Sequence, residues 1–219
     1  MVENEVDTNF IVQYCKENKD VTYPSLYHIL IDERNKTIYN ELEDDILECG
    51  LKIQGDSLLI LAGKENDRNT YFRNMLSVNK KYVICDQTLN GVSANRKAAG
   101  ELDLLIKNRE QMPIAIIEAL TLSSVNKKYI SEHIDKLFSY DTWGLPNNYI
   151  LAYIEKCNFE TFKKRYKKFI QEYAYPVKCV DVGEKSKYAE MAVFDVNILR
   201  NGKKGRITHI LINLQEGKK

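Results

Sequence analysis

The stretch Gly100–Leu122, GELDLLIKNREQMPIAIIEALTL, places acidic residues inside apolar segments. Two of its segments, GELDLLI and PIAIIEALTL, have the composition of β-strands, and the polar residues Asn108–Gln111 between them predict a hairpin. Side chains alternate faces along a strand, so Glu101 and Asp103 share one face of the first strand. In an antiparallel pair of these strands, Asp103 and Glu118 would meet across the ladder.

Carboxylates that are brought together in or beside a sheet repel each other and lose their hydration. A divalent cation removes this cost, and hard cations such as Mg²⁺ (or Mn²⁺) bind carboxylate oxygens. We therefore expect a metal site at the edge of a sheet, with Asp103 and Glu118 as ligands. Glu101 is either a third ligand or a solvated residue at the start of its strand. The alternative for the acidic pair is a structural role, in which it binds a lysine or arginine side chain.

Composition restricts the class of protein. The chain has 219 residues, is 44% hydrophobic and carries a formal net charge of +1, which fits one domain, or one domain with an appendage. No global positive field attracts nucleic acid, so any such contact must use local patches. No apolar run is long enough for a membrane span, and the N-terminus is polar rather than signal-like. Five scattered cysteines without a CxxC pair indicate reduced thiols in a cytoplasmic protein.

The rest of the sequence predicts an α/β protein. Residues 1–62 are expected to form an N-terminal helical appendage that ends in one or two short strands over Leu51–Ala62, and that binds a second copy or a partner protein. Residues 63–219 are expected to form a mixed sheet flanked by helices on both faces. The helices expected in this second part are residues 67–78, 126–140 and 158–173. Its expected strands besides the acidic hairpin are residues 82–88, 149–154, 177–182, 190–199 and 206–214.

The order of these elements, with the run DQTLNGVSANRKAAGELDLLI followed by PIAIIEAL, resembles the core of the PD-(D/E)XK nuclease superfamily over roughly Gly63–Tyr173. It is similar to nuclease-like domains of bacterial anti-phage defence proteins. The resemblance implies a restriction-endonuclease-like sheet and Mg²⁺-dependent hydrolysis of phosphodiester bonds, with DNA as the favoured nucleic acid. Asp103 matches the first acidic position and Glu118 the second. By the same analogy, the backbone carbonyl of Ala119 is a further metal ligand.

The sequence departs from the family at the lysine expected two residues after the second acid, where it has Leu120. Lysine at that position would orient the attacking water and stabilise developing negative charge. Three replacements are open. Lys97, in the loop before the acidic strand, is favoured; the others are Lys127 or Lys128 at the start of the next helix, and Gln87 on the neighbouring strand.

Two functions follow from this pattern. The first is a metal-dependent endonuclease that serves as an effector in anti-phage defence. The second is a nuclease-like module that has lost its lysine and binds a partner protein or nucleic acid without cutting it. His133 has two interpretations as well, a partly buried histidine with a structural role or a general base.

Overall fold

The structure is a computed structural model, and it describes residues 24–56, 64–78, 81–90, 100–109, 111–186 and 188–214. The chain divides into two compact units, Met1–Asp45 and Ile46–Lys219, and all the strands belong to the second. The boundary predicted between residues 62 and 63 stays a prediction. None of the helices described is both long and apolar enough to cross a membrane.

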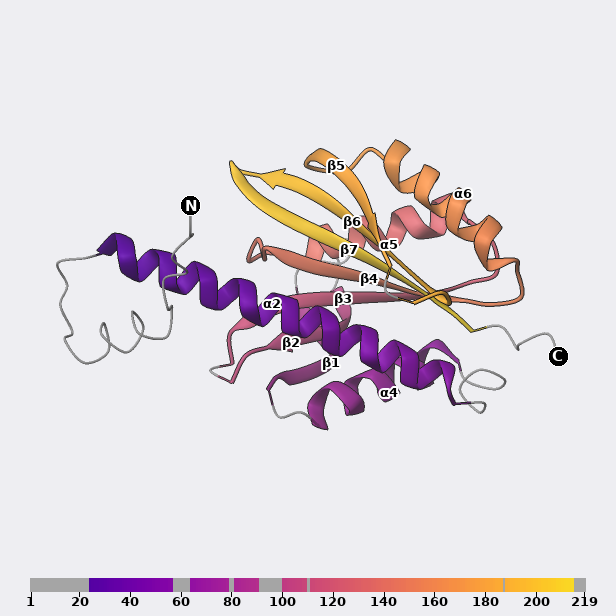
Figure 1. Cartoon of the computed structure of the whole chain (residues 1–219), viewed down its shortest axis with the longest axis horizontal. Helices are drawn as coiled ribbons and strands as arrows, with labels where there is room; N and C mark the ends of the chain where they lie inside the picture. Colours follow the sequence, from indigo (N-terminus) through magenta and orange to yellow (C-terminus); the bar gives the residue numbers. More distant parts are fainter. Residues whose placement is uncertain are drawn as a thin grey trace, which may run out of the picture. The chain divides into compact units, whose positions relative to one another are not determined.

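One mixed sheet of seven strands forms the centre of the second unit, and this confirms the predicted fold class (Figure 1). The strand order is β1-β2-β3-β4-β7-β6-β5. Strands β3, β4 and β7 run parallel, and the strands on both sides of them pair antiparallel. The strand bounds are β1 Val83–Asn90, β2 Gly100–Lys107, β3 Pro113–Leu122, β4 Asn147–Ile154, β5 Lys178–Lys185, β6 Met191–Arg200 and β7 Lys203–Asn213.

Helices cover both faces of the sheet. On one face, α5 (Lys127–Tyr140) and α6 (Phe159–Glu172) bury their apolar stripes against β3, β4, β6 and β7. On the opposite face, α4 (Glu65–Val78) packs beside β1, β2 and β3, and its Phe72 ring contacts Tyr153 of β4. Burial of these stripes is the main source of stability in such a layered fold.

The two predicted hairpins form for the reason that the sequence indicates. At the β6–β7 turn, Asn201 and Gly202 both have positive φ, of 50° and 78°, which matches the twist of an antiparallel pair. In the β2–β3 loop, the side chain of Asn108 accepts a hydrogen bond from the N–H of Met112 at 2.9 Å, and Gln111 has a φ of 63°. Local turn chemistry thus sets the register of the acidic strands.

The strand expectation for Leu51–Ala62 is wrong over its first residues. Helix α2 (Pro24–Gln54) continues through Gly50, which does not end the helix, and residues 57–62 lie outside the described chain. A Cβ atom on Gly50 would lie 2.8 Å from Met191 Cε and 3.0 Å from Ile212 Cδ1. The glycine therefore permits close approach of the helix end to β6 and β7, a role that its position in the sequence did not reveal.

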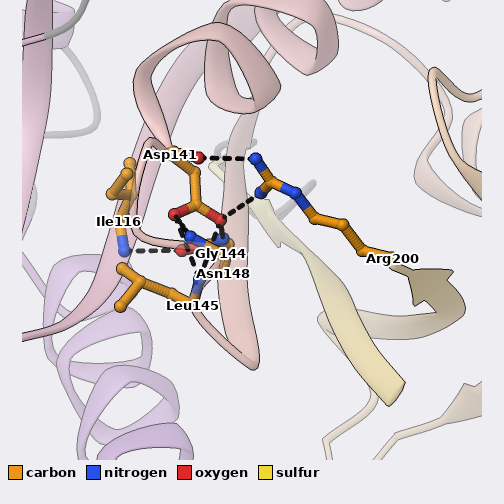
Figure 2. A network of polar contacts seen from close by, with 6 residues as sticks. All are labelled: Ile116, Asp141, Gly144, Leu145, Asn148 and Arg200. Atoms are coloured by element: carbon orange, nitrogen blue, oxygen red, sulfur yellow. Dashed lines mark hydrogen bonds and ion pairs between the residues drawn. The ribbon is translucent and has the colours of Figure 1, made fainter. Parts of the chain in front are cut away.

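A buried polar network fixes the C-terminal end of α5 (Figure 2). The Asp141 carboxylate accepts hydrogen bonds from the backbone N–H groups of Gly144 and Leu145 and from the side chains of Asn148 and Arg200, at 2.9–3.1 Å. The Asn148 side chain in turn accepts a 2.9 Å hydrogen bond from the N–H of Ile116. The network thus joins the end of α5 to β3, β4 and β6, and this sets where α5 lies on the sheet.

We expect Asp141→Ala to lower the free energy of unfolding by about 3 kcal/mol, because it leaves a guanidinium and three other donors without their buried acceptor. Equilibrium denaturation with urea measures the change. Glu172→Ala, which removes an exposed carboxylate on α6, is the matched control and should cost less than about 0.5 kcal/mol. A loss below about 1 kcal/mol for Asp141→Ala would contradict the structural role of the network.

Candidate metal centre

The acidic pair lies where β2 separates from β3. The backbone pairing of these strands ends at Leu104 and Ile117, one step before Asp103 and Glu118. Beyond that step, the Asp103 carboxylate accepts a 2.8 Å hydrogen bond from the N–H of Ala119. A side chain therefore replaces the next backbone acceptor of the ladder, and the regular pairing of β2 with β3 ends beside the two acids.

Glu118 is fully buried although it is ionisable. It occupies a position on β3 that faces α5, and it shares that face with Leu120. Neither of its carboxylate oxygens has a well-aligned hydrogen bond from any described residue. Burial raises the pKa of Glu118, and the charge of Asp103 raises it further, while His133 and Lys136 act in the opposite direction.

Helix α5 supplies the basic side chains of the site. Its first turn is capped by Asn126, whose side chain accepts a 3.1 Å hydrogen bond from the N–H of Tyr129. His133 Nδ1 lies 3.6 Å from Glu118 Oε2, and its ring packs edge-on against Tyr129 with 4.6 Å between centroids. Lys136 follows three residues later on the same face of the helix.

The Lys136 amine lies between the two acids. Its Nζ is 2.8 Å from Glu118 Oε2 and 3.5 Å from Asp103 Oδ1, and it also lies 5.5 Å from the centre of the Tyr140 ring. Burial lowers the pKa of Lys136, but the two carboxylates outweigh that effect, and the pKa is raised overall. The ammonium is therefore the positive charge that balances the acidic pair.

A third carboxylate belongs to the same electrostatic environment. Glu65 lies in the first turn of α4, on the opposite side of the sheet from α5. Its pKa is raised by burial and by the charge of Asp103, and is lowered by His133 and by hydrogen bonds from Thr121. The Glu65 carboxylate thus responds to the charges of Asp103 and His133 without being one of the grouped ligand atoms.

The donors present fit a divalent cation. Ligand atoms of Asp103, Glu118 and His133 all lie within 4.8 Å of one another, so this group can hold a metal ion. The buried Oε1 of Glu118 has no hydrogen-bond partner among the described residues, and this supports a ligand there, because such atoms normally have partners. Two carboxylates and an imidazole suit several divalent metals.

The other residues predicted for the site have different outcomes. Lys97 lies outside the described residues, and Glu101 and Gln87 are described only as parts of β2 and β1, so their roles stay predictions. Lys128 is 88% exposed, and its Nζ pairs with Glu132 Oε1 at 3.9 Å. Lys127 is exposed as well. The structure thus brings together Asp103 and Glu118.

Sequence reasoning missed the participation of Lys136 and Glu65. A signal for Lys136 existed in the spacing of Tyr129, His133, Lys136 and Tyr140, which follow each other at steps of four, three and four residues. This stripe runs beside the apolar stripe that contains Ile130, Ile134 and Leu137, so it borders the core. A basic residue in such a stripe is a candidate for pairing with a buried acid. No comparable signal marks Glu65.

Comparisons with known proteins add little to this assignment. No family model matches the sequence, and neither does any curated protein. Among solved structures, a chain from the "cryoEM structure DrdV-DNA complex" is similar over 76% of this chain and 84% of that chain, with 12% identity and a TM-score of 0.34. A likeness at this level supports no inference about function, and the site rests on its own geometry. The mixed sheet and the Asp103, Glu118 and His133 cluster are compatible with a PD-(D/E)XK core.

We expect the stability of metal-free Glu118→Gln, relative to that of the wild type, to increase as pH rises. The folded protein holds the Glu118 proton more tightly than the unfolded chain, so this residue contributes stability below its ordinary pKa near 4.5 and loses that contribution as pH rises through its raised folded-state value. Glutamine has no such loss. The stability of Glu118→Gln relative to the wild type should therefore be higher at about pH 8 than at about pH 5, as measured by urea denaturation at both pH values.

Glu160→Gln, at an exposed position on α6, is the control and should show no such difference. A stability difference between Glu118→Gln and the wild type that stays constant from about pH 5 to about pH 8, or that moves in favour of the wild type as pH rises, would contradict the raised pKa of this buried acid.

Proposed function

We propose that this protein is a metal-dependent nuclease that hydrolyses phosphodiester bonds, with DNA as its favoured substrate, and that it acts as an effector in anti-phage defence. The observation that carries the enzymatic part is the position of the Lys136 amine, 2.8 Å from Glu118 and 3.5 Å from Asp103. Two acids and one lysine at this spacing are the charged groups that the PD-(D/E)XK resemblance requires. The defence role rests on that resemblance alone.

Lys136 takes the place of the lysine that is missing at Leu120. Leu120 is completely buried, in the core cluster that also contains Ile130, Ile134 and Leu137 of α5. A lysine at this position would have to place its charge among these apolar side chains, at a large desolvation cost. An amine that projects from α5 itself reaches the acids from the more accessible side, since Lys136 is 27% exposed.

The chain would use its own groups as follows. Asp103, Glu118 and His133 would hold a divalent cation, which polarises the scissile phosphate and lowers the pKa of a bound water. Lys136 would stabilise the negative charge that develops on the phosphate oxygens as the water oxygen bonds to phosphorus. The water would lose its proton to solvent, and the departing oxygen would take a proton from solvent.

The backbone supports a further ligand at Ala119. In an antiparallel ladder, the N–H and C=O of one residue point toward the same neighbouring strand. The N–H of Ala119 points toward Asp103, to which it donates a hydrogen bond. The Ala119 carbonyl is therefore directed toward β2 and its Asp103, which supports the ligand that the family analogy implies.

The same ion pair also fits the second function. In a nuclease-like module that has lost its activity, Lys136 would neutralise two acids that no longer bind metal. Asp103 and Glu118 would then have the structural role in which an acidic pair binds a lysine side chain. Such a module would bind a partner protein or nucleic acid elsewhere on its surface. The two functions differ in whether the acids bind metal and whether DNA is cut.

Incubation of the protein with supercoiled plasmid and Mg²⁺ or Mn²⁺ tests the nuclease. We expect cleavage by the wild type, and none by Asp103→Asn or Glu118→Gln, which keep the shapes of the acids but remove their charges. Lys136→Met should lower the cleavage rate about 100-fold or more, because the charge that stabilises the transition state is lost. Agarose gels of the time course give the rates.

Lys128→Met is the matched control on the same helix and should cleave at the rate of the wild type. Lys97→Met tests the residue that the sequence favoured. If the cleavage rate falls strongly in Lys97→Met and changes little in Lys136→Met, then Lys97 rather than Lys136 stabilises the developing charge. Cleavage that survives Asp103→Asn and Glu118→Gln would reject the site, and a wild type that neither cuts nor binds Mn²⁺ would favour the non-catalytic module.

A further inference from the structure

The Lys136 ammonium occupies the region in which a divalent cation would be bound. Its Nζ lies in contact with one oxygen of Glu118 and close to one oxygen of Asp103, the two carboxylates that would hold the metal. A divalent cation bound by both would lie within a few ångströms of this amine. Two positive charges at such a separation repel strongly in a partly buried site. The amine and the cation therefore compete for the same oxygens.

We propose that Lys136 is the resting counter-ion of the acidic site, and that binding of a divalent cation displaces its amine from Glu118 and Asp103. This inference rests on the proposed function, since it describes how that site changes from its metal-free to its metal-bound state. It assigns Lys136 a second role, in which the residue sets the metal affinity of the site in addition to stabilising negative charge.

Displacement of the amine would prepare the site for its substrate. Once released, the Lys136 ammonium lacks its carboxylate partners and needs a new anion within reach of its flexible stem. A phosphodiester that approaches the metal supplies that anion. Metal and polyanion would then bind with positive coupling, because each favours the displaced position of Lys136.

The side chains around Lys136 allow such a movement. The lysine is 27% exposed, so its amine has a path toward solvent, and Tyr140 offers an aromatic face 5.5 Å away that can accept a cation. By contrast, Glu118 is completely buried on a central strand and cannot follow the amine. The mobile partner of the pair is thus the lysine.

Titration calorimetry with Mn²⁺ at neutral pH, on the full-length protein, tests the competition. We expect Lys136→Met to bind Mn²⁺ roughly tenfold more tightly than the wild type, since the acids lose their internal cation. Lys128→Met should bind as the wild type does. A lysine with a purely structural role would not give this result, because its removal would disorder the acids and weaken metal binding.

Thermal unfolding provides a second readout. Without metal, Lys136→Met should unfold roughly 5 °C below the wild type, because two acids are left without a partner. Saturating Mn²⁺ should raise its unfolding temperature by more than it raises that of the wild type. An equal or smaller rise would count against displacement.

If Lys136→Met does not fold, acetylation of lysines on the wild type, read by mass spectrometry, decides the question. Lys136 should react slowly without metal and several-fold faster with saturating Mg²⁺, while the exposed Lys128 should react equally in both states. Unchanged or slower reaction of Lys136 would overturn displacement.

The outcomes separate the two proposals. Mn²⁺ binding to the wild type that is equal to, or tighter than, binding to Lys136→Met overturns only the counter-ion role of Lys136. Absence of Mn²⁺ binding in both proteins overturns this role and the metal-dependent nuclease together.

Discussion

Burial of the Glu118 carboxylate against helix α5 is the constraint on which the candidate site depends. A fully buried acid on a strand of the sheet centre is costly to dehydrate, and in this protein its oxygens have no well-aligned hydrogen bond from the described residues. The surroundings offset the cost with charge instead, through the Lys136 ammonium and the nearby imidazole of His133. An arrangement that keeps a poorly satisfied acid inside the fold is characteristic of function rather than of stability.

The position of α5 links this constraint to the rest of the fold. The helix is held at its N-terminus by the Asn126 cap and at its C-terminus by the Asp141 network, which extends to Arg200 on β6 (Figure 2). Between these ends, one stripe of α5 packs in the core, and the neighbouring stripe presents His133 and Lys136 to the acids. Apolar packing and the buried network therefore fix the basic groups of the site relative to Glu118.

Sequence reasoning reached those features that depend on local pattern. Turn residues such as Asn201-Gly202 predicted the hairpins, and apolar runs predicted the strands. The two-residue period of a β-strand predicted that Asp103 and Glu118 lie together. It did not reach Lys136, because the distance from this lysine to the acids depends on where α5 lies on the sheet, and that placement involves Arg200, 59 residues beyond Asp141. The role of Gly50 inside α2 was missed for a similar reason, since the lack of space for a Cβ atom there arises from Met191 of β6 and Ile212 of β7, which are distant in sequence.

The central claim is that Asp103 and Glu118 bind one divalent cation together. Crystals soaked in Mn²⁺, with data collected at the manganese absorption edge, test it most directly. We predict one strong anomalous peak within about 2.0–2.4 Å of an oxygen of each acid, with the Lys136 amine moved away from Glu118. Density that shows the amine still between the two carboxylates at saturating Mn²⁺, with no anomalous peak beside them, would contradict the account.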